Sequence, residues 1–300
     1  MSSIRYDKLP TEQNNPATRR IDQLSTLRAL RLINKEDAKV AKAVSSQIRP
    51  MGKAVRMIVA SLRNGGHLFF IGAGTSGRLG VLEAAECPPT FNTPPSLIRA
   101  FMAGGKPSVF KSKEGAEDRG MDSARLIRKN VKRNDVVIGI AASGVTSFVK
   151  EGLRVAKKRG AKTILVTCNP RQTSHLADVV IAPRVGPEVI AGSTRLKAAT
   201  ATKLVLNSLT VTSMIQLGKV YGNRMVDLQP KSNKLKARAL RLIQLLAKVS
   251  PKKAETLYIQ SGKNAKTAIL MGKKNLKQSD AVRLLKKTAG HLHAALTLKR

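Results

Sequence analysis

Residues 67–77 read HLFFIGAGTSG, an apolar run that passes directly into a glycine-rich turn. Runs that are apolar at consecutive positions, without alternation, are typical of strands buried on both faces of a sheet. Strands of this kind that alternate with helices predict an α/β fold with a doubly wound parallel sheet. Four more such runs follow, and most are separated by helical stretches: residues 96–104, 135–144, 163–169 and 179–185.

The stretch before these runs predicts helices. Apolar residues recur at spacings of three and four between residues 21 and 64, as at Leu24, Leu27 and Leu30. The Gly65–Gly66 pair is typical of a helix C-terminus. Residues 1–19 are polar and contain two prolines, so we expect an arm that leads into the helices.

The stretch after the runs also predicts helices. Residues 194–218 form one long apolar segment, and residues 219–230 read as a turn and linker. We therefore expect three parts: an N-terminal arm with helices, a central α/β domain and a small basic helical subdomain, at residues 1–66, 67–230 and 231–300.

The chain is strongly basic, with 55 Lys and Arg against 18 Asp and Glu and a formal net charge of +37. One interpretation is a solvated basic surface; the other is attraction to phosphate polymers or anionic membranes. Because the cations are spread along the chain, we favour the first and expect any nucleic-acid binding to be weak and non-specific. Aromatic residues make up 3% and Trp is absent, which argues against a platform for stacked bases.

The cellular compartment is predicted from segments that the sequence lacks. The first residues, MSSIRYDKLPTEQ, have no apolar signal-peptide core, and no run of apolar residues is long enough for a transmembrane helix. Cys87 and Cys168 are far apart and match no metal-ligand spacing. We expect a cytoplasmic protein without a membrane partner.

Two hydroxyl-rich turns follow predicted strands. GAGTSG (72–77) formally matches the dinucleotide fingerprint, but residues 95–103 offer no acid for the ribose, so we favour a phosphate monoester held by Thr75 and Ser76. AASGVTS (141–147) adds Ser143 and Thr146. Either turn alone also fits an ordinary capped turn. Together, at the carboxyl ends of neighbouring parallel strands, they predict one phosphate site.

Further candidates come from acids and a third hydroxyl motif. Glu86 begins ECPPT (86–90), which is expected just beyond the helix that follows the first glycine-rich turn. Glu86 and Glu117 lie near the glycine-rich turns in a chain with few acids, and two carboxyl groups in different environments suit acid/base chemistry on a sugar. In GSTRLK (192–197), Ser193 and Lys197 are expected to close over an anion. The alternative for GSTRLK is a helix N-cap with exposed cations.

Together these motifs resemble the N-acetylmuramic acid 6-phosphate etherases, a branch of the sugar isomerase (SIS) fold. The resemblance covers the chain from about residue 21 to its end; ECPPT (86–90) and EGAED (114–118) are the specific motifs. It implies cleavage of the D-lactyl ether of N-acetylmuramate 6-phosphate, which gives N-acetylglucosamine 6-phosphate and D-lactate in cell-wall recycling. It implies no metal and no cofactor.

The resemblance also implies roles for single residues. Glu86 corresponds to the family's proton donor and Glu117 to its second active-site glutamate, and both are expected to face the pocket that Ser76 and Ser143 line. Family members form homodimers with sites near the interface. The alternative is a non-catalytic sugar-phosphate sensor similar to the glucokinase regulatory protein, and the presence of both glutamates favours the enzyme. The sequence departs from the family pattern at Val145, Ser147–Phe148 and Ala199.

Overall fold

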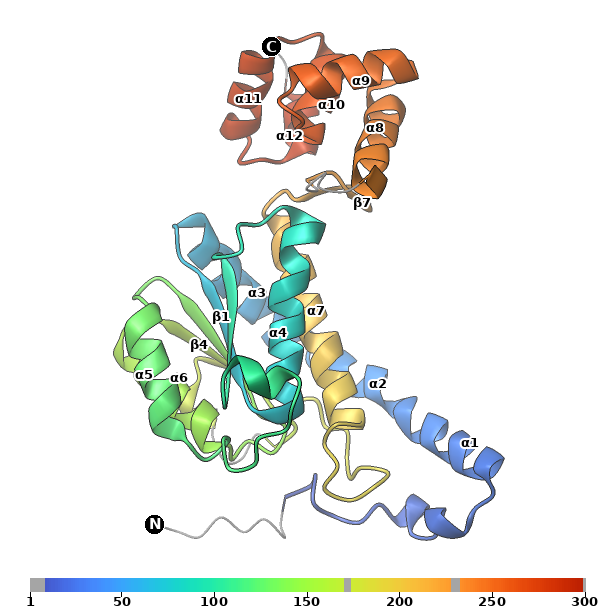
Figure 1. The fold of residues 1–300 in the computed structure, drawn as a ribbon, viewed down its shortest axis with the longest axis vertical. Helices are drawn as coiled ribbons and strands as arrows, with labels where there is room; N and C mark the ends of the chain where they lie inside the picture. The colour runs from blue at the N-terminus through green and yellow to red at the C-terminus, as the bar shows by residue number, and fades with distance from the viewer. Residues whose placement is uncertain (1–8, 170–173, 228–232, 299–300) are drawn as a thin grey trace. The chain divides into compact units, whose positions relative to one another are not determined.

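The computed structural model of the protein describes residues 9–169, 174–227 and 233–298. A parallel five-stranded sheet forms its centre, with strand order β2-β1-β3-β4-β5 (Figure 1). Each strand overlaps one of the five apolar runs, so the predicted α/β class and parallel sheet are confirmed. The strands are β1 (Leu68–Gly72), β2 (Ile98–Met102), β3 (Val136–Ile140), β4 (Lys162–Val166) and β5 (Val179–Ile181).

Helices cover both faces of the sheet (Figure 1). The side chains of Phe69, Ile71 and Leu165 form a buried core with the helices on one face, and Phe148 of α6 fills this core at 1% exposure. Phe148 is one of the positions that depart from the family pattern, and its burial gives it a packing role. The helices on this face are α5 (Gly120–Asn130) and α6 (Ser147–Lys158); α3 (Ile48–Arg63), α4 (Gly74–Phe91) and α7 (Lys197–Gln216) lie on the other.

The N-terminal helices precede the sheet as predicted: α1 (Thr26–Asp37), α2 (Lys39–Ser45) and α3. The backbone N–H of Gly66 donates to the carbonyl of Ser61 at 2.9 Å, and Gly65 takes a φ of 74°. This is the 6→1 hydrogen bond of a Schellman motif, in which a glycine relieves the strain of the left-handed conformation. The predicted helix end at the glycine pair is confirmed.

Helix α4 continues farther than the sequence predicts. The ECPPT motif was expected just beyond this helix, but it lies inside it, with Pro88 and Pro89 in its last turns. Each proline removes one backbone donor, and this cost is smallest close to a helix end. The helix ends at Phe91, and the next residue, Asn92, takes a left-handed φ of 54° and donates its N–H to the carbonyl of Pro88 at 3.0 Å.

The contacts divide the chain into two compact units. The first comprises Met1–Ala84 and Ser96–Thr210; the second comprises Ala85–Pro95 and Val211–Arg300. The N-terminal helices thus share a unit with the sheet. The ends of α4 and α7 join the C-terminal helices. The predicted domain boundary at residues 230 and 231 lies outside the described residues.

The second unit has its own core, built from helices and one short hairpin. Ile243, Tyr258 and Ile269 are buried in this core. Asp227 also lies in this unit and pairs with Lys219 at 2.9 Å and Lys266 at 3.1 Å. The elements are β6 (Val220–Tyr221), β7 (Arg224–Met225), α8 (Asn233–Ala247), α9 (Pro251–Gln260), α10 (Ala265–Lys274), α11 (Gln278–Lys287) and α12 (Leu292–Thr297).

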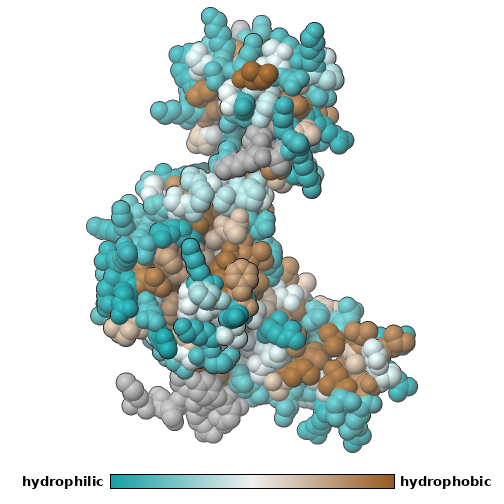
Figure 2. All heavy atoms as spheres, viewed as in Figure 1, coloured by the Kyte–Doolittle hydropathy of each residue, from teal (hydrophilic) through white to brown (hydrophobic). Residues whose placement is uncertain are grey.

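Apolar side chains also lie on the surface. Figure 2 shows them gathered over the region of α1 and α2. Leu27 and Leu30 of α1 are 66% and 56% exposed, and Ile48 at the start of α3 is 65% exposed. Among the described helices, none has both the length and the apolar character that a membrane-spanning segment requires.

Candidate active site

The turn between β1 and α4 brings backbone donors to the edge of the sheet. A side chain on Gly72 would come within 2.8 Å of the Gly77 nitrogen, and one on Gly77 within 2.8 Å of the Gly72 carbonyl oxygen. Glycine at both positions therefore lets the strand and the first helical turn approach closely. Thr75 and Ser76 lie in that first turn, where free N–H groups and the helix dipole favour an anion.

The turn between β3 and α6 approaches the same edge. Thr146 occupies the N-cap of α6, yet its side chain makes no capping hydrogen bond. The hydroxyl oxygen of Ser143 accepts from the Val145 N–H at 3.3 Å. Strands β1 and β3 are neighbours, and the chain passes from β2 to β3 across β1. Ligands of open α/β sheets bind at such a switch point.

A third loop, between β2 and α5, supplies carboxyl groups. The carbonyl of Glu117 accepts from the Phe148 N–H at 2.9 Å, which fixes this loop to the first turn of α6. The side chain of Glu117 is half-buried, whereas Glu114 is exposed and accepts from the Ser112 hydroxyl at 2.7 Å. Glu117 therefore lies beside the two hydroxyl-rich turns.

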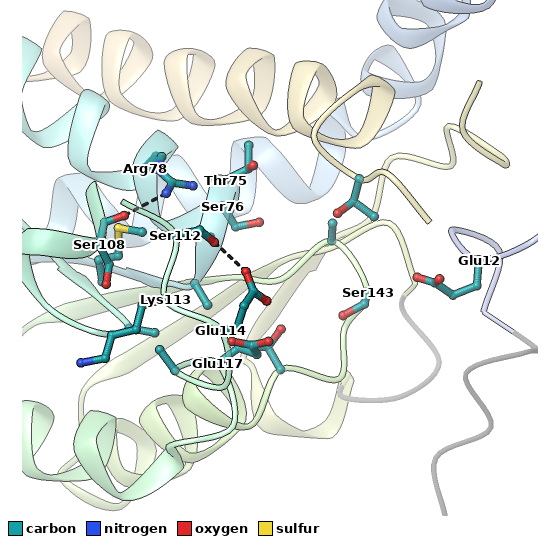
Figure 3. A pocket seen from close by; sticks show the side chains of 18 residues that line it. Glu12, Thr75, Ser76, Arg78, Ser108, Ser112, Lys113, Glu114, Glu117 and Ser143 are labelled. Carbon is teal, nitrogen blue, oxygen red and sulfur yellow. Dashed lines mark hydrogen bonds between the residues drawn. The ribbon is translucent and has the colours of Figure 1, made fainter. Parts of the chain in front are cut away.

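These loops enclose a cavity of about 320 Å³ (Figure 3). It unites five of the predicted site residues: Thr75, Ser76, Glu117, Ser143 and Thr146. Several other residues that the sequence does not predict also line the cavity, including Glu12 of the N-terminal arm, Arg78, Ser108 and Thr194. Glu12 follows Thr11, which is buried and accepts from the backbone N–H of Gly192 at 3.1 Å. No local motif around Glu12 signals this contact, because it joins residues far apart in the chain.

Lys197 does not bind an anion in this cavity, so that prediction is wrong. Its side chain is 1% exposed, and its Nζ lies 2.6 Å from a carboxyl oxygen of Glu36. Burial acts to raise the pKa of Glu36, but hydrogen bonds from Lys197, Lys39 and Asn15 outweigh it and lower the pKa from 4.5 to about 2. A buried carboxylate is the stronger partner for this ammonium, so Lys197 links the start of α7 to α1.

The start of α7 is also capped differently from the prediction. The backbone N–H groups of Lys197 and Ala198 each donate to the carboxyl of Glu188 at 2.9 Å. Glu188 thus takes the role expected of a Ser or Thr N-cap, and its burial raises its pKa above the usual value. Ser193 does not line the cavity; its neighbour Thr194 does.

Glu86 is not among the residues that line the cavity. It is exposed and lies near the C-terminal end of α4. Glu86 belongs to the second compact unit, and the expectation that Glu86 and Glu117 face the same pocket stays a prediction. One turn before Glu86, the buried Glu83 accepts from Thr210 at 2.6 Å and from Asn207 at 2.9 Å, which joins α4 to α7.

The described residues contain no group of three His, Cys, Asp or Glu side chains that lie close enough to hold a metal ion. Cys168 is buried, and that burial raises the pKa of its thiol to about 12. At neutral pH it is therefore a protonated thiol, the poorer ligand and nucleophile.

Comparisons with known proteins define the class first. The model of the SIS domain matches residues 121–212, and the model of the glucokinase regulatory protein N-terminal SIS domain matches residues 50–157. A phosphoheptose isomerase from Francisella tularensis superposes with a TM-score of 0.52 at 17% identity, over 64% of this chain and 100% of that chain. The fold and the matched models define an SIS-domain protein.

Full-length relatives then give the family. A protein of Trichodesmium erythraeum is 48% identical over 96% of this chain and 94% of its own length, and one of Rhodopirellula baltica is 46% identical over 97% of each. Both are named N-acetylmuramic acid 6-phosphate etherase. The chain belongs to the N-acetylmuramic acid 6-phosphate etherase family.

Proposed function

We propose that the cavity at the carboxyl ends of β1 and β3 is the active site of this carbon–oxygen lyase. The enzyme cleaves the D-lactyl ether of N-acetylmuramate 6-phosphate and yields N-acetylglucosamine 6-phosphate and D-lactate, a step of muramic acid recycling. The observation that carries the assignment is that one cavity combines two hydroxyl-rich turns with the half-buried Glu117. The sensor alternative is not favoured, because the full-length relatives are etherases.

The phosphate is proposed to bind at the two turns. The side chains of Thr75, Ser76 and Thr146 make no hydrogen bond to other described residues, so their hydroxyls are available to an anion. Backbone N–H groups in the first turns of α4 and α6 add donors in the same place. This anchor leaves the sugar carbons to extend toward the loop that carries Glu117.

Glu117 is proposed to act as the base. Once the sugar ring has opened to its aldehyde, the proton on C2 is acidic, and Glu117 removes it. The C3–O bond then breaks, and the electron pair of the C2–H bond becomes the C2=C3 double bond. The departing lactate oxygen takes a proton, for which we propose Glu86, and water adds across the double bond. The roles of the two glutamates are exchangeable in this scheme.

Glu86 is proposed to reach the site from a second copy of the chain. Its exposed carboxyl is accessible to a partner chain in a homodimer. Leu27 and Leu30 of α1 are exposed and support dimer formation, because the free energy falls when a partner covers an apolar surface.

We propose that the basic surface binds nucleic acid only weakly and without sequence preference. Residues 231–300 contain 18 Lys and Arg and two acids, Glu255 and Asp280. Counterion release should make such binding fall steeply as salt rises, which a filter-binding titration measures. A tight, sequence-selective complex at physiological salt would contradict this proposal.

The substrate also suggests the location. We propose that the enzyme works in the cytoplasm, because a charged phosphomonoester does not cross a lipid bilayer unaided. Fractionation of cells that express the protein, with an assay for D-lactate release, checks this placement. Activity confined to the medium would contradict it.

The test of the function separates proton removal from ether cleavage. The parent enzyme should release D-lactate from N-acetylmuramate 6-phosphate and exchange the C2 hydrogen in deuterated water. In Glu117→Gln, the rates of D-lactate release and of C2 exchange should both fall by about 10²- to 10⁴-fold, the usual contribution of a general base. Glu114→Gln is the matched control, since Glu114 lines the same cavity but is exposed, and it should retain exchange. A parent without D-lactate release, or a Glu117→Gln variant that keeps both exchange and D-lactate release, refutes the assignment. Normal exchange without D-lactate release would instead make Glu117 the acid and Glu86 the base.

A further inference from the structure

Arg78 presents unused hydrogen-bond donors on the wall of the cavity. It lies on α4, two residues after Ser76 (Figure 3). Its Nε donates to the Val109 carbonyl at 2.9 Å and its Nη2 to the Ser108 carbonyl at 3.0 Å. A guanidinium has five N–H donors, so three remain. None of the described carboxyl groups forms an ion pair with Arg78.

Ser108 supplies a second, independent observation. Ser108 is 3% exposed and lines the same cavity, and its hydroxyl has no hydrogen-bond partner among the described residues. An unpartnered buried hydroxyl is unfavourable, so such groups in folded proteins usually bind a ligand or water. A side chain on Gly104 would come within 2.1 Å of this hydroxyl, so the glycine leaves it room.

The two groups together are suited to a carboxylate. The hydrogen bonds to the loop hold the guanidinium in place, and they occupy the edge formed by Nε and Nη2. The opposite edge, formed by Nη1 and Nη2, matches the two oxygens of a carboxylate. The Ser108 hydroxyl adds a neutral donor beside it.

The substrate has two anionic groups, and the proposed function places its phosphate at the turns after β1 and β3. The other is the carboxylate of the lactyl ether, which the product N-acetylglucosamine 6-phosphate lacks. We propose that Arg78 and Ser108 bind this carboxylate and so select the lactyl ether. The inference rests on the proposed function. It gives the cavity two anion subsites, of which one recognises only the group that leaves.

The experiment compares the two ligands in a Glu117→Gln background, where the substrate is not consumed. Arg78→Gln should weaken binding of N-acetylmuramate 6-phosphate on the order of 10- to 100-fold, the usual effect of losing a hydrogen bond to a charged group. Binding of N-acetylglucosamine 6-phosphate should not change. Ser108→Ala should act in the same direction by a smaller factor, and it leaves the loop contacts of Arg78 in place.

Arg159→Gln is the control. Arg159 also donates its Nε to a backbone carbonyl, that of Val131 at 2.7 Å, but it does not line the cavity. The Arg159→Gln variant should bind both ligands as tightly as the parent does. Equal losses for both ligands in Arg78→Gln and Ser108→Ala, or no loss in either, would overturn the subsite. If only Lys113→Gln selectively lost binding of N-acetylmuramate 6-phosphate, the carboxylate subsite would lie at Lys113 and not at Arg78. A parent that releases no D-lactate would refute the proposed function instead.

Discussion

At the scale of single residues, the proposed phosphate site can be tested at the hydroxyl group of Ser143. Ser143→Ala removes one hydroxyl at the turn after β3 and leaves the backbone donors in place. Binding of N-acetylglucosamine 6-phosphate should weaken by about 1–3 kcal/mol, because a hydrogen bond to a charged group is lost. Isothermal titration calorimetry measures the change. Ser147→Ala, at a neighbouring residue that does not line the cavity, is the control. Unchanged affinity in Ser143→Ala would show that the phosphate binds elsewhere.

Single residues differ in how well the sequence predicts their place. Ser76 and Ser143 were found because glycine-rich turns after buried strands are local patterns, and the parallel sheet brings those turns together. Lys197 was misplaced because its partner, Glu36, lies 161 positions away and follows from tertiary packing alone. Arg78 and Ser108 were missed for the same reason: the hydrogen bond from the Arg78 guanidinium to the Ser108 carbonyl joins α4 to a loop 30 positions away.

At the level of elements, the pair of Glu36 and Lys197 connects α1 to α7, and it should make stability depend on pH. The pKa of Glu36 is about 2 in the folded chain and 4.5 without that environment. The contribution is therefore complete above pH 4.5 and is lost as the pH falls toward 2, and its size is on the order of 3 kcal/mol.

Denaturant unfolding at pH 6 and pH 3 measures this contribution. The parent should lose more stability between the two pH values than Glu36→Gln, which has no carboxyl to protonate. At pH 6, Glu36→Gln should itself be less stable than the parent, since it leaves the buried Lys197 without its charge partner. Glu255→Gln, at an exposed position, should behave like the parent. Equal pH dependence in the parent and Glu36→Gln would show that the pair does not set acid stability.

The strands were easier to predict than the helix ends. Continuous apolar runs suffice to predict strands buried on both faces, and all five were found. The end of α4 was predicted too early because two consecutive prolines usually mark a break. In the fold the helix passes through them, and Asn92 ends it by taking a left-handed conformation. That compensation depends on where the surrounding structure holds the helix, and the sequence motif does not record it.

For the whole molecule, the proposal that Glu86 reaches the site from a partner chain has a consequence for assembly. If each site takes Glu117 from one chain and Glu86 from its partner, one chain alone has no complete site. Homodimers restore two sites through two-fold symmetry, because each surface then meets the other twice. The exposed apolar face of α1 is consistent with such an assembly. The first requirement is that the protein has the mass of a dimer in solution.

Mixed dimers test this arrangement directly. Glu86→Gln and Glu117→Gln should each release almost no D-lactate when expressed alone. In a randomly mixed population about half of the dimers hold one chain of each kind, and one of their two sites then has both glutamates, so activity should return to about a quarter of the parental value. Two purification tags allow the mixed dimers to be isolated, and the isolated mixed dimers should have about half of the parental activity. Each variant paired with its own second-tag copy is the control. If both glutamates of a site came from the same chain, every mixed dimer would lack a complete site, and activity would stay at the level of the single variants.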